Sequence, residues 1–275
     1  MAKNIEDVKD FWEKNPLFLG ESIYPFSSEE FFKEHNSIYV QDCFAGRLDE
    51  RLIPNIKKNS RILDAGCGIG FWTETFLKNG FTNLFACDIT DVAVSATTAR
   101  IKSITNNATI TKQNIEQLNF NNEYFDWVNC QGVLHHTPNP YEAIKEFHRV
   151  LKPKGELVFS VYHKSIFLRF SFYILRLLPK SLKRLISLPG RGREKMLYSK
   201  NLNEFIRSYD GIENPIGIGF TKSEIIDLLD SRFEIKYIYK HYLPIRKFPL
   251  KVPKYLHRIL DRTLGLMIFV NCSKK

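Results

Sequence analysis

Short apolar runs alternate with amphipathic runs between residues 61 and 162. The strand-like runs cover residues 61–65, 83–88, 108–112, 125–130 and 156–162, and the helix-like runs cover residues 72–79, 92–102 and 140–150. Such alternation with short connections predicts a parallel β-sheet covered by helices on both faces. Right-handed crossovers then bring the carboxyl ends of the parallel strands to one edge of the sheet. We therefore predict an α/β core whose ligand site lies at that edge.

The segments that precede and follow this core have different patterns. Residues 1–48 predict a helical preface with aromatic side chains, among them Trp12 and Tyr39. Residues 163–220, called the cap segment below, interrupt the alternation and begin with a thirteen-residue apolar run at 166–178. This run predicts a helix, and the Pro- and Gly-containing stretch 189–193 predicts a mobile loop.

The regular pattern resumes in residues 221–275. Thr221 and Glu224 form a capping-box pattern that predicts the start of a short helix. Strand-like runs follow at residues 233–239 and 266–271 and complete the sheet. The chain thus divides into four predicted units: the preface 1–48, the core 49–162, the cap segment 163–220 and the closing unit 221–275.

A glycine-rich turn follows the first strand-like run. Gly66, Gly68 and Gly70 recur at every second position, so the backbone can pass close to a ligand without a Cβ in the way. The dinucleotide fingerprint requires its third glycine at position 71, where this chain has Phe71. A nicotinamide or flavin cofactor is therefore disfavoured. Asp64, two residues before the first glycine, favours a cofactor with a cationic amino-acid end, such as S-adenosyl-L-methionine.

Polar side chains also follow the other strand-like runs. Asp88 ends the second run some twenty residues after the glycine turn, where a carboxylate can accept both ribose hydroxyls. Asn114 follows the third run, Gln131 the fourth and Tyr162 the fifth. We expect these side chains to meet at the carboxyl edge of the sheet.

Two adjacent histidines follow the fourth strand-like run. A neutral imidazole of His135 or His136 can take a proton from a hydroxyl group, and one of the two is the candidate general base. The alternative is that they only shape the loop before Pro138. The residues leave both interpretations open. Tyr162 and His163 are second candidates.

Four motifs in this order resemble the class I S-adenosylmethionine-dependent methyltransferases, in their broad small-molecule branch. They are Leu63-Asp-Ala-Gly-Cys-Gly-Ile-Gly70, Asp88, Val133-Leu-His-His-Thr-Pro138 and Arg149-Val-Leu-Lys-Pro-Lys-Gly155. The resemblance covers about residues 50–162, and Lys154 departs from the glycine that relatives carry. It implies a Rossmann-like, doubly wound seven-stranded sheet, mostly parallel with a C-terminal antiparallel strand, preceded by the helical preface and interrupted by the cap segment after the fifth strand.

The resemblance also implies roles for individual residues. Asp64 and the three glycines would hold the methionine end of the cofactor, and Asp88 would hold its ribose. Asn114 stands where relatives usually carry an aspartate that contacts the adenine amino group, and an amide oxygen can accept the same hydrogen bond. The remaining expected cofactor contacts are Ile89, Ile115 and Gln131. His135 and His136 would face the methyl acceptor, and the preface would lie over the cofactor.

The positive charge of the chain is concentrated in the cap segment. The net charge is +10, and the stretch 164–207 contains eleven Lys and Arg against two Glu, which gives +9. Such a block predicts an anionic partner: a membrane surface, nucleic acid, or a phosphorylated or carboxylated substrate. The run 166–178 is too short for a membrane span. It either packs on the domain, which we favour, or also touches a membrane face.

These features rank three functions. The leading hypothesis is a small-molecule methyltransferase acting on a hydroxyl of a sugar, lipid-like or secondary-metabolite acceptor. A nucleic-acid methyltransferase ranks lower, because residues 129–132 (Asn-Cys-Gln-Gly) match neither the Asn/Asp-Pro-Pro-aromatic run nor the Pro-Cys pair of such enzymes. A non-catalytic cofactor-binding scaffold is disfavoured by the intact glycine turn with Asp64 and Asp88.

Cysteine usage and the N-terminal residues bear on location. The five cysteines include no C-x-x-C pair, which disfavours a disulfide framework and a metal site. The N-terminal stretch has no apolar signal region, which disfavours secretion by a cleaved leader. We therefore expect a cytoplasmic protein, with peripheral membrane contact through residues 164–207 as the alternative.

Overall fold

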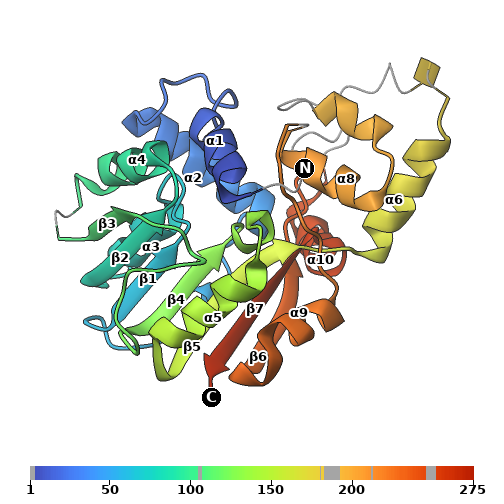
Figure 1. Ribbon diagram of the computed structural model, residues 1–275. Coiled ribbons are helices and arrows are strands. Elements are labelled where there is room, and N and C mark those ends of the chain that lie inside the picture. The colour runs from blue at the N-terminus through green and yellow to red at the C-terminus, as the bar shows by residue number, and fades with distance from the viewer. Residues whose placement is uncertain (1–3, 105–106, 180, 183–192, 212, 246–251) are drawn as a thin grey trace.

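A seven-stranded sheet forms the centre of the protein. The computed structural model describes residues 4–104, 107–179, 181–182, 193–211, 213–245 and 252–275. The strands are β1 (Arg61–Ala65), β2 (Asn83–Asp88), β3 (Thr109–Lys112), β4 (Phe125–Gln131), β5 (Leu151–Tyr162), β6 (Phe233–His241) and β7 (Met267–Lys274), in the spatial order β3-β2-β1-β4-β5-β7-β6 (Figure 1). The first five strands pair in parallel, and β7 is antiparallel to both β5 and β6. The predicted fold class is confirmed.

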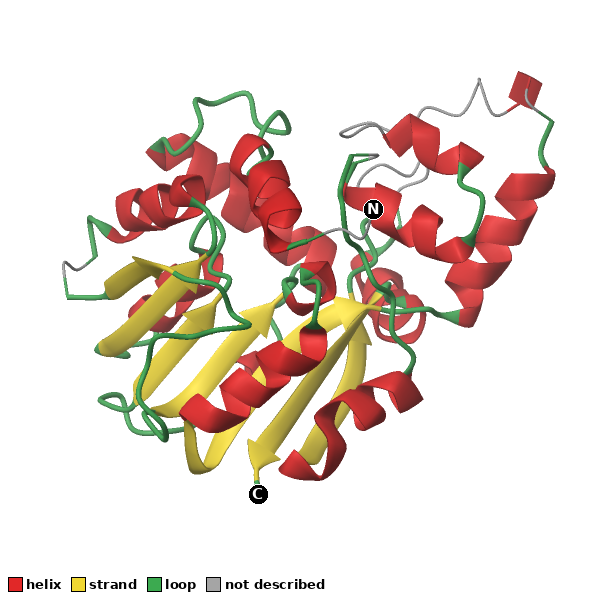
Figure 2. Cartoon of the chain, viewed as in Figure 1, coloured by secondary structure: helices red, strands yellow, loops and turns green. Residues whose placement is uncertain are grey.

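Helices cover both faces of the sheet (Figure 2). They are α1 (Ile5–Lys14), α2 (Glu29–Phe44), α3 (Phe71–Lys78), α4 (Asp91–Ile101), α5 (Pro140–Val150), α6 (Ile166–Leu177), α8 (Leu202–Arg207), α9 (Lys222–Leu229) and α10 (Lys254–Leu264). Alternate strand residues point to opposite faces, so the strands contribute to two cores. One core joins the strands to α5 and α9, and the other joins them to α2 and α3. Both capping-box residues of α9, Thr221 and Glu224, bond as predicted.

The cap segment forms a small helical unit beside the carboxyl edge of the sheet, where α6 and α8 lie apart from the main layers (Figure 1). Its own core consists of Phe172, Met196 and Phe205, packed with parts of α6 and α8. No helix among the described residues is long and apolar enough to cross a bilayer. Residues 189–192 of the predicted loop lie outside the described residues.

Two elements differ from the sequence-based expectation. The fifth strand-like run was predicted to begin at residue 156, after a turn at residues 151–155, but those five residues lie within β5. The pairing with β4 shifts register there between Phe125 and Trp127, and Lys154 has a left-handed φ of 63°. The strand therefore accommodates the extra residues as a bulge and continues. Helix α10 was not predicted, because its buried residues are the polar His257 and Asp261 rather than an apolar stripe.

A buried ionic cluster joins α10 to the far edge of the sheet. His241 of β6 is hydrogen-bonded through Nδ1 to Asp261 of α10, and its Nε2 lies 3.0 Å from Oδ2 of Asp49. Asp49 also accepts a bond of 2.6 Å from Arg51. Burial alone would lower the pKa of His241, but the bonds to the two carboxylates outweigh it and raise that pKa. The imidazolium form therefore stabilises this corner of the fold.

This cluster predicts a pH dependence of stability. Because the pKa of His241 is raised on folding, its contribution is fully present below the ordinary histidine pKa of about 6.5 and is lost as pH rises through the raised folded value. The free energy of unfolding of the wild type should therefore fall relative to that of His241→Gln as pH increases. Urea denaturation across this range measures the difference. The control His148→Gln, on α5, should not reproduce it; a pH-independent difference for His241→Gln would contradict the assignment.

Candidate functional site

The glycine turn after β1 has a conformation that requires glycine. Gly66, Gly68 and Gly70 have positive φ angles of 76°, 53° and 79°. A Cβ on Gly66 would lie 2.3 Å from a methyl carbon of Val133, in the loop after β4. A Cβ on Gly68 would meet no atom within 4 Å and would project into the cavity that this residue lines. The turn is thus closely packed at Gly66 and open toward a ligand at Gly68.

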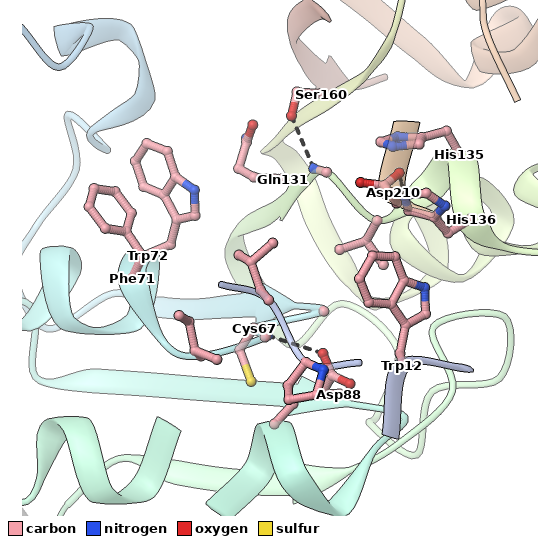
Figure 3. Close-up of a pocket in the computed structure, with 18 of the residues that line it drawn as sticks. Trp12, Cys67, Phe71, Trp72, Asp88, Gln131, His135, His136, Ser160 and Asp210 are labelled. Carbon is pink, nitrogen blue, oxygen red and sulfur yellow. Dashed lines mark hydrogen bonds and ion pairs between the residues drawn. The ribbon is translucent and has the colours of Figure 1, made fainter. Parts of the chain in front are cut away.

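Asp88 at the end of β2 lies beside this turn (Figure 3). Its Oδ2 accepts a hydrogen bond of 3.0 Å from the Gly68 amide, and its Oδ1 accepts bonds of 3.1 and 2.9 Å from the amide and hydroxyl of Thr90. Burial raises its pKa, and these hydrogen bonds oppose the rise. The carboxylate therefore lies ready to accept hydroxyl groups from the cavity.

A cavity of about 280 Å³ extends from Asp88 along the carboxyl ends of the strands. Its lining at the carboxyl ends of the strands, called its polar end below, includes Cys67, Ile89, Asn114, Ile115 and Gln131. Aromatic side chains from α1, α2, α3 and the closing unit also line it: Trp12, Tyr39, Trp72, Tyr242 and Phe269. Trp12 lies near Asp88 and His136, whereas Trp72 lies across the cavity from them (Figure 3). Such a lining offers both polar groups and apolar surface to a ligand.

The side-chain carbonyl oxygen of Gln131, a residue that lines this cavity, accepts no hydrogen bond from the described residues. Its Nε2 donates to Oδ1 of Asn129 at 3.0 Å and to the Val158 carbonyl at 3.2 Å, whereas its buried Oε1 has no hydrogen-bond partner. The Asn114 side chain differs, because its Oδ1 accepts a bond of 3.0 Å from the Glu116 amide. An unsatisfied buried carbonyl at the wall of a cavity indicates that a ligand donor belongs there.

Both histidines line the cavity, but their surroundings differ (Figure 3). His135 is only 1% exposed. Burial, and to a smaller extent the neighbouring His136, lowers its pKa well below the ordinary value. His136 has its Nδ1 2.7 Å from the Ile216 carbonyl oxygen and its Nε2 3.5 Å from Oδ2 of Asp210. The ring of Trp12 packs edge-on against it at 5.0 Å.

Comparison with known proteins agrees with this geometry. The methyltransferase domain family matches residues 63–159, which contain the glycine turn, Asp88 and both histidines. The chain carries a class I methyltransferase domain. The cofactor of this domain is S-adenosylmethionine.

Curated relatives of this methyltransferase domain are similar over part of their length. A ubiquinone biosynthesis O-methyltransferase of Coxiella burnetii is 29% identical over 129 residues, which cover 45% of this chain and 54% of the relative. One of Colwellia psychrerythraea is 31% identical over 163 residues, covering 58% of each chain. The chain thus spans little more than half the length of these relatives.

Solved structures share the fold over nearly the whole chain. A methyltransferase of Methanosarcina mazei has a TM-score of 0.57 at 22% identity and covers 83% of this chain and 98% of its own. The [4+2]-cyclase SpnF has the same TM-score at 13% identity and covers 100% of this chain and 97% of its own. At these identities the likeness concerns the fold alone.

The residues of the methyltransferase domain fit its cofactor, with two positions that differ from the expectation. Gly66, Gly68, Asp88 and Gln131 line the cavity, as do Ile89, Asn114 and Ile115. Gly70 is not a lining residue; it begins α3 and packs on Thr97, where a Cβ would lie 3.1 Å from the Thr97 backbone. Its role is to let the turn enter the helix.

Asp64 also lies behind the turn rather than in the cavity. Its Oδ2 accepts a bond of 2.6 Å from the Thr73 hydroxyl, and its Oδ1 accepts one of 2.9 Å from the Asn129 amide. The sequence analysis expected Asp64 to contact the cofactor directly. Its side chain instead points to the sheet face that α3 covers. Burial raises the pKa of Asp64 to about 6. The two hydrogen bonds oppose this rise, and the negative charge of Asp88 adds to it.

The structure brings in residues that sequence analysis did not assign. Asp210 lines the cavity from the cap segment, and the Tyr162 hydroxyl donates to it at 2.7 Å. No local sequence pattern distinguishes Asp210 from the other acidic residues of the cap segment. Tyr162 lines the cavity, whereas His163, the other second candidate, does not line it. The closing unit contributes Tyr242, whose hydroxyl lies 2.5 Å from that of Tyr209.

The raised pKa of Asp64 predicts how stability changes with pH. The folded state holds the proton more tightly than the unfolded chain, so the contribution of Asp64 is lost as pH rises from about 4 through about 6. Between these limits the free energy of unfolding of the wild type should fall relative to Asp64→Asn by up to about 3 kcal/mol. Denaturant titrations of the ligand-free protein give this difference. The exposed control Asp227→Asn should show none, and a flat difference for Asp64→Asn would refute the assignment.

Proposed function

We propose that this protein transfers a methyl group from S-adenosylmethionine to a hydroxyl of a small, apolar, ring-bearing or lipid-like acceptor. The observation that carries the proposal is that a histidine suited to accept a proton, His136, opens onto the same cavity as the glycine turn and Asp88. The relatives named as ubiquinone biosynthesis O-methyltransferases support transfer to oxygen.

Cofactor binding would use the polar end of the cavity. Asp88 would accept the two ribose hydroxyls, and Asn114 with Ile115 would border the adenine. The Gly68 backbone and the open carbonyl of Gln131 would meet the methionine end, with Asp64 acting through the turn and α3. When bound, the cofactor supplies an electrophilic methyl group on a sulfonium sulfur.

Methyl transfer to a hydroxyl group requires a base that takes up the hydroxyl proton. The acceptor oxygen forms a bond to the methyl carbon while the carbon–sulfur bond breaks, and the electron pair of that bond stays on sulfur. The hydroxyl proton passes to Nε2 of His136. A carbonyl oxygen only accepts hydrogen bonds, so the contact with Ile216 places the hydrogen of the neutral ring on Nδ1 and leaves Nε2 unprotonated.

His135 is the weaker candidate for this role. Its pKa is lowered well below the ordinary value by burial, and a base of low pKa removes a hydroxyl proton less effectively. Its ring packs against Tyr162 and His136, each at 4.1 Å between centroids. We infer that His135 orients the two rings beside it.

The aromatic side chains that line the cavity favour a flat apolar acceptor over a sugar. Trp12, Tyr39, Trp72 and Phe269 offer ring faces and few hydrogen-bonding groups. The Trp72 indole nitrogen already donates to the Tyr39 hydroxyl at 3.2 Å. These walls would also exclude water from the reacting atoms, which displacement at carbon requires.

The outer face of α6 supports peripheral contact with an anionic membrane. Ile166, Phe170 and Leu177 are 86%, 63% and 83% exposed at helical spacing, whereas Phe172 on the opposite side is buried. Exposed Arg169 and Arg176 lie along one side of this apolar stripe, and residues 157–193 contain no Asp or Glu. Apolar side chains beside cations match a bilayer surface with anionic headgroups.

Cofactor binding tests the first part of the proposal. S-adenosylhomocysteine should bind with micromolar affinity in calorimetry, and Asp88→Ala should weaken binding at least about 100-fold, because hydrogen bonds to a charged group contribute about 1.5–3 kcal/mol each. Asp227→Ala is the matched control. Labelled S-adenosylmethionine with catechol as a probe acceptor then tests transfer. A folded wild-type protein that does not bind the ligand would rule out the proposed enzyme.

Vesicle co-sedimentation tests the membrane contact. The protein should bind phosphatidylglycerol vesicles at low salt, bind phosphatidylcholine vesicles much less, and be released at high salt. The double variant Phe170→Ser/Leu177→Ser should lose most of this binding, since it removes apolar area from the stripe. Tyr255→Ser, at a 70% exposed position on α10, is the control. Equal binding to both kinds of vesicle, or none to the anionic ones, would exclude the contact.

A further inference from the structure

The cap segment supplies both polar partners of the His136 ring. Nδ1 lies 2.7 Å from the carbonyl oxygen of Ile216, and Nε2 lies 3.5 Å from Oδ2 of Asp210. The cap backbone also binds the adjacent residue, since the Ile218 amide donates to the His135 carbonyl at 2.9 Å. The loop after β4 therefore has its orientation fixed from a segment more than seventy residues away in sequence.

Asp210 is itself held in place by the core. The Tyr162 hydroxyl, at the end of β5, donates to the same Oδ2 at 2.7 Å. The side chains of Asp210 and His136 are 15% and 7% exposed. The carboxylate and the ring therefore lie close together at a place that is largely shielded from water.

The separation between this carboxylate and the ring suits a base. A neutral ring with its hydrogen on Nδ1 has no hydrogen to donate from Nε2, and 3.5 Å is longer than a hydrogen bond. Nε2 is therefore available to an acceptor hydroxyl before transfer. After it has taken the proton, the ring is a cation directly beside an anion, so the interaction strengthens only as the reaction proceeds.

The titratable groups that face His136 reinforce this assignment. They are Asp210 of the cap segment, Tyr162 of β5 and the adjacent His135, whose lowered pKa keeps it neutral. Trp12 of α1 covers the ring from the remaining side and carries no charge. Among these groups Asp210 is the acidic residue whose side chain lies beside the ring, 3.5 Å from Nε2.

We propose that Asp210 is a positioning residue for methyl transfer: from its place beside Nε2 of His136 it stabilises the charge that the ring gains when it accepts the proton, while the Ile216 carbonyl fixes the tautomer. This inference rests on the proposed function, because it assigns His136 as the base. It makes the cap segment a part of the reaction site rather than only a cover.

Kinetics with Asp210→Asn, Asp210→Glu and the control Glu213→Gln tests the proposal. With catechol as the probe acceptor, Asp210→Asn should lower kcat by about tenfold or more and leave KM nearly unchanged, since the carboxylate acts on the base and not on acceptor binding. The acid limb of its kcat profile should move to lower pH, because the ring loses the anion that favours its protonated form. Asp210→Glu should restore part of kcat, and Glu213→Gln, at an exposed cap position, should match the wild type.

A second measurement is independent of catalysis. Nitrogen NMR of the ring in the ligand-free protein, assigned with His136→Gln, should show the hydrogen on Nδ1 and, at a given acidic pH, a smaller protonated fraction in Asp210→Asn than in the wild type. If this change is found but no acceptor is methylated, the proposed function fails while the coupling stands. If methyl transfer occurs and Asp210→Asn leaves kcat, its pH profile and the spectrum unchanged, this inference is overturned.

Two further outcomes are also decisive. A rise in KM with unchanged kcat for Asp210→Asn would overturn the proposal, because it would make Asp210 a binding group for the acceptor. If Asp210→Asn does not fold, Tyr162→Phe removes the bond that holds the carboxylate and keeps the ring. That variant should lower kcat less than about tenfold and shift the acid limb in the same direction; an unchanged profile would contradict the proposal.

Discussion

The close approach of two loops at Gly66 and Val133 is the constraint on which the site depends. With any side chain at position 66, its Cβ would overlap the Val133 methyl group at 2.3 Å. The amides of Gly66 and Cys67 both donate to the Cys87 carbonyl, at 2.7 and 2.9 Å, so the same turn is also tied to the end of β2. Backbone packing therefore fixes the distance between the cofactor turn and the loop that carries the two histidines.

Two carboxylates lie beside the turn, Asp64 buried and Asp88 half-buried. Asp64 and Asp88 both have raised pKa values because burial disfavours their charged forms. Hydrogen bonds from Thr73, Asn129 and the Gly68 amide offset part of that cost. A ligand with a cationic end would favour the charged forms further, so cofactor binding and the ionisation of these groups are expected to be linked.

The cap segment has two sides with different chemistry. Its inner side presents a carboxylate and a backbone carbonyl to His136, at the one place where the proposed reaction needs a fixed tautomer. Its outer side presents the apolar stripe of α6 beside two arginines. If both proposals hold, the same short unit would complete the reaction site and bring it to the surface from which an apolar acceptor comes.

The sequence by itself determined the fold class and identified most of the predicted cofactor residues that line the cavity. Local patterns were sufficient there, because strand and helix periods, the glycine spacing and Asp88 at a strand end are all encoded within a few residues. Helix α10 was missed because its buried residues, His257 and Asp261, are polar and find partners only in other elements. Only the tertiary structure placed Asp64 under α3 and Asp210 beside His136, since neither position has a neighbouring residue in sequence that reveals its partner. Contacts between segments far apart in the chain decide which nitrogen of His136 lies against the Ile216 carbonyl, and no sequence period or motif reveals them.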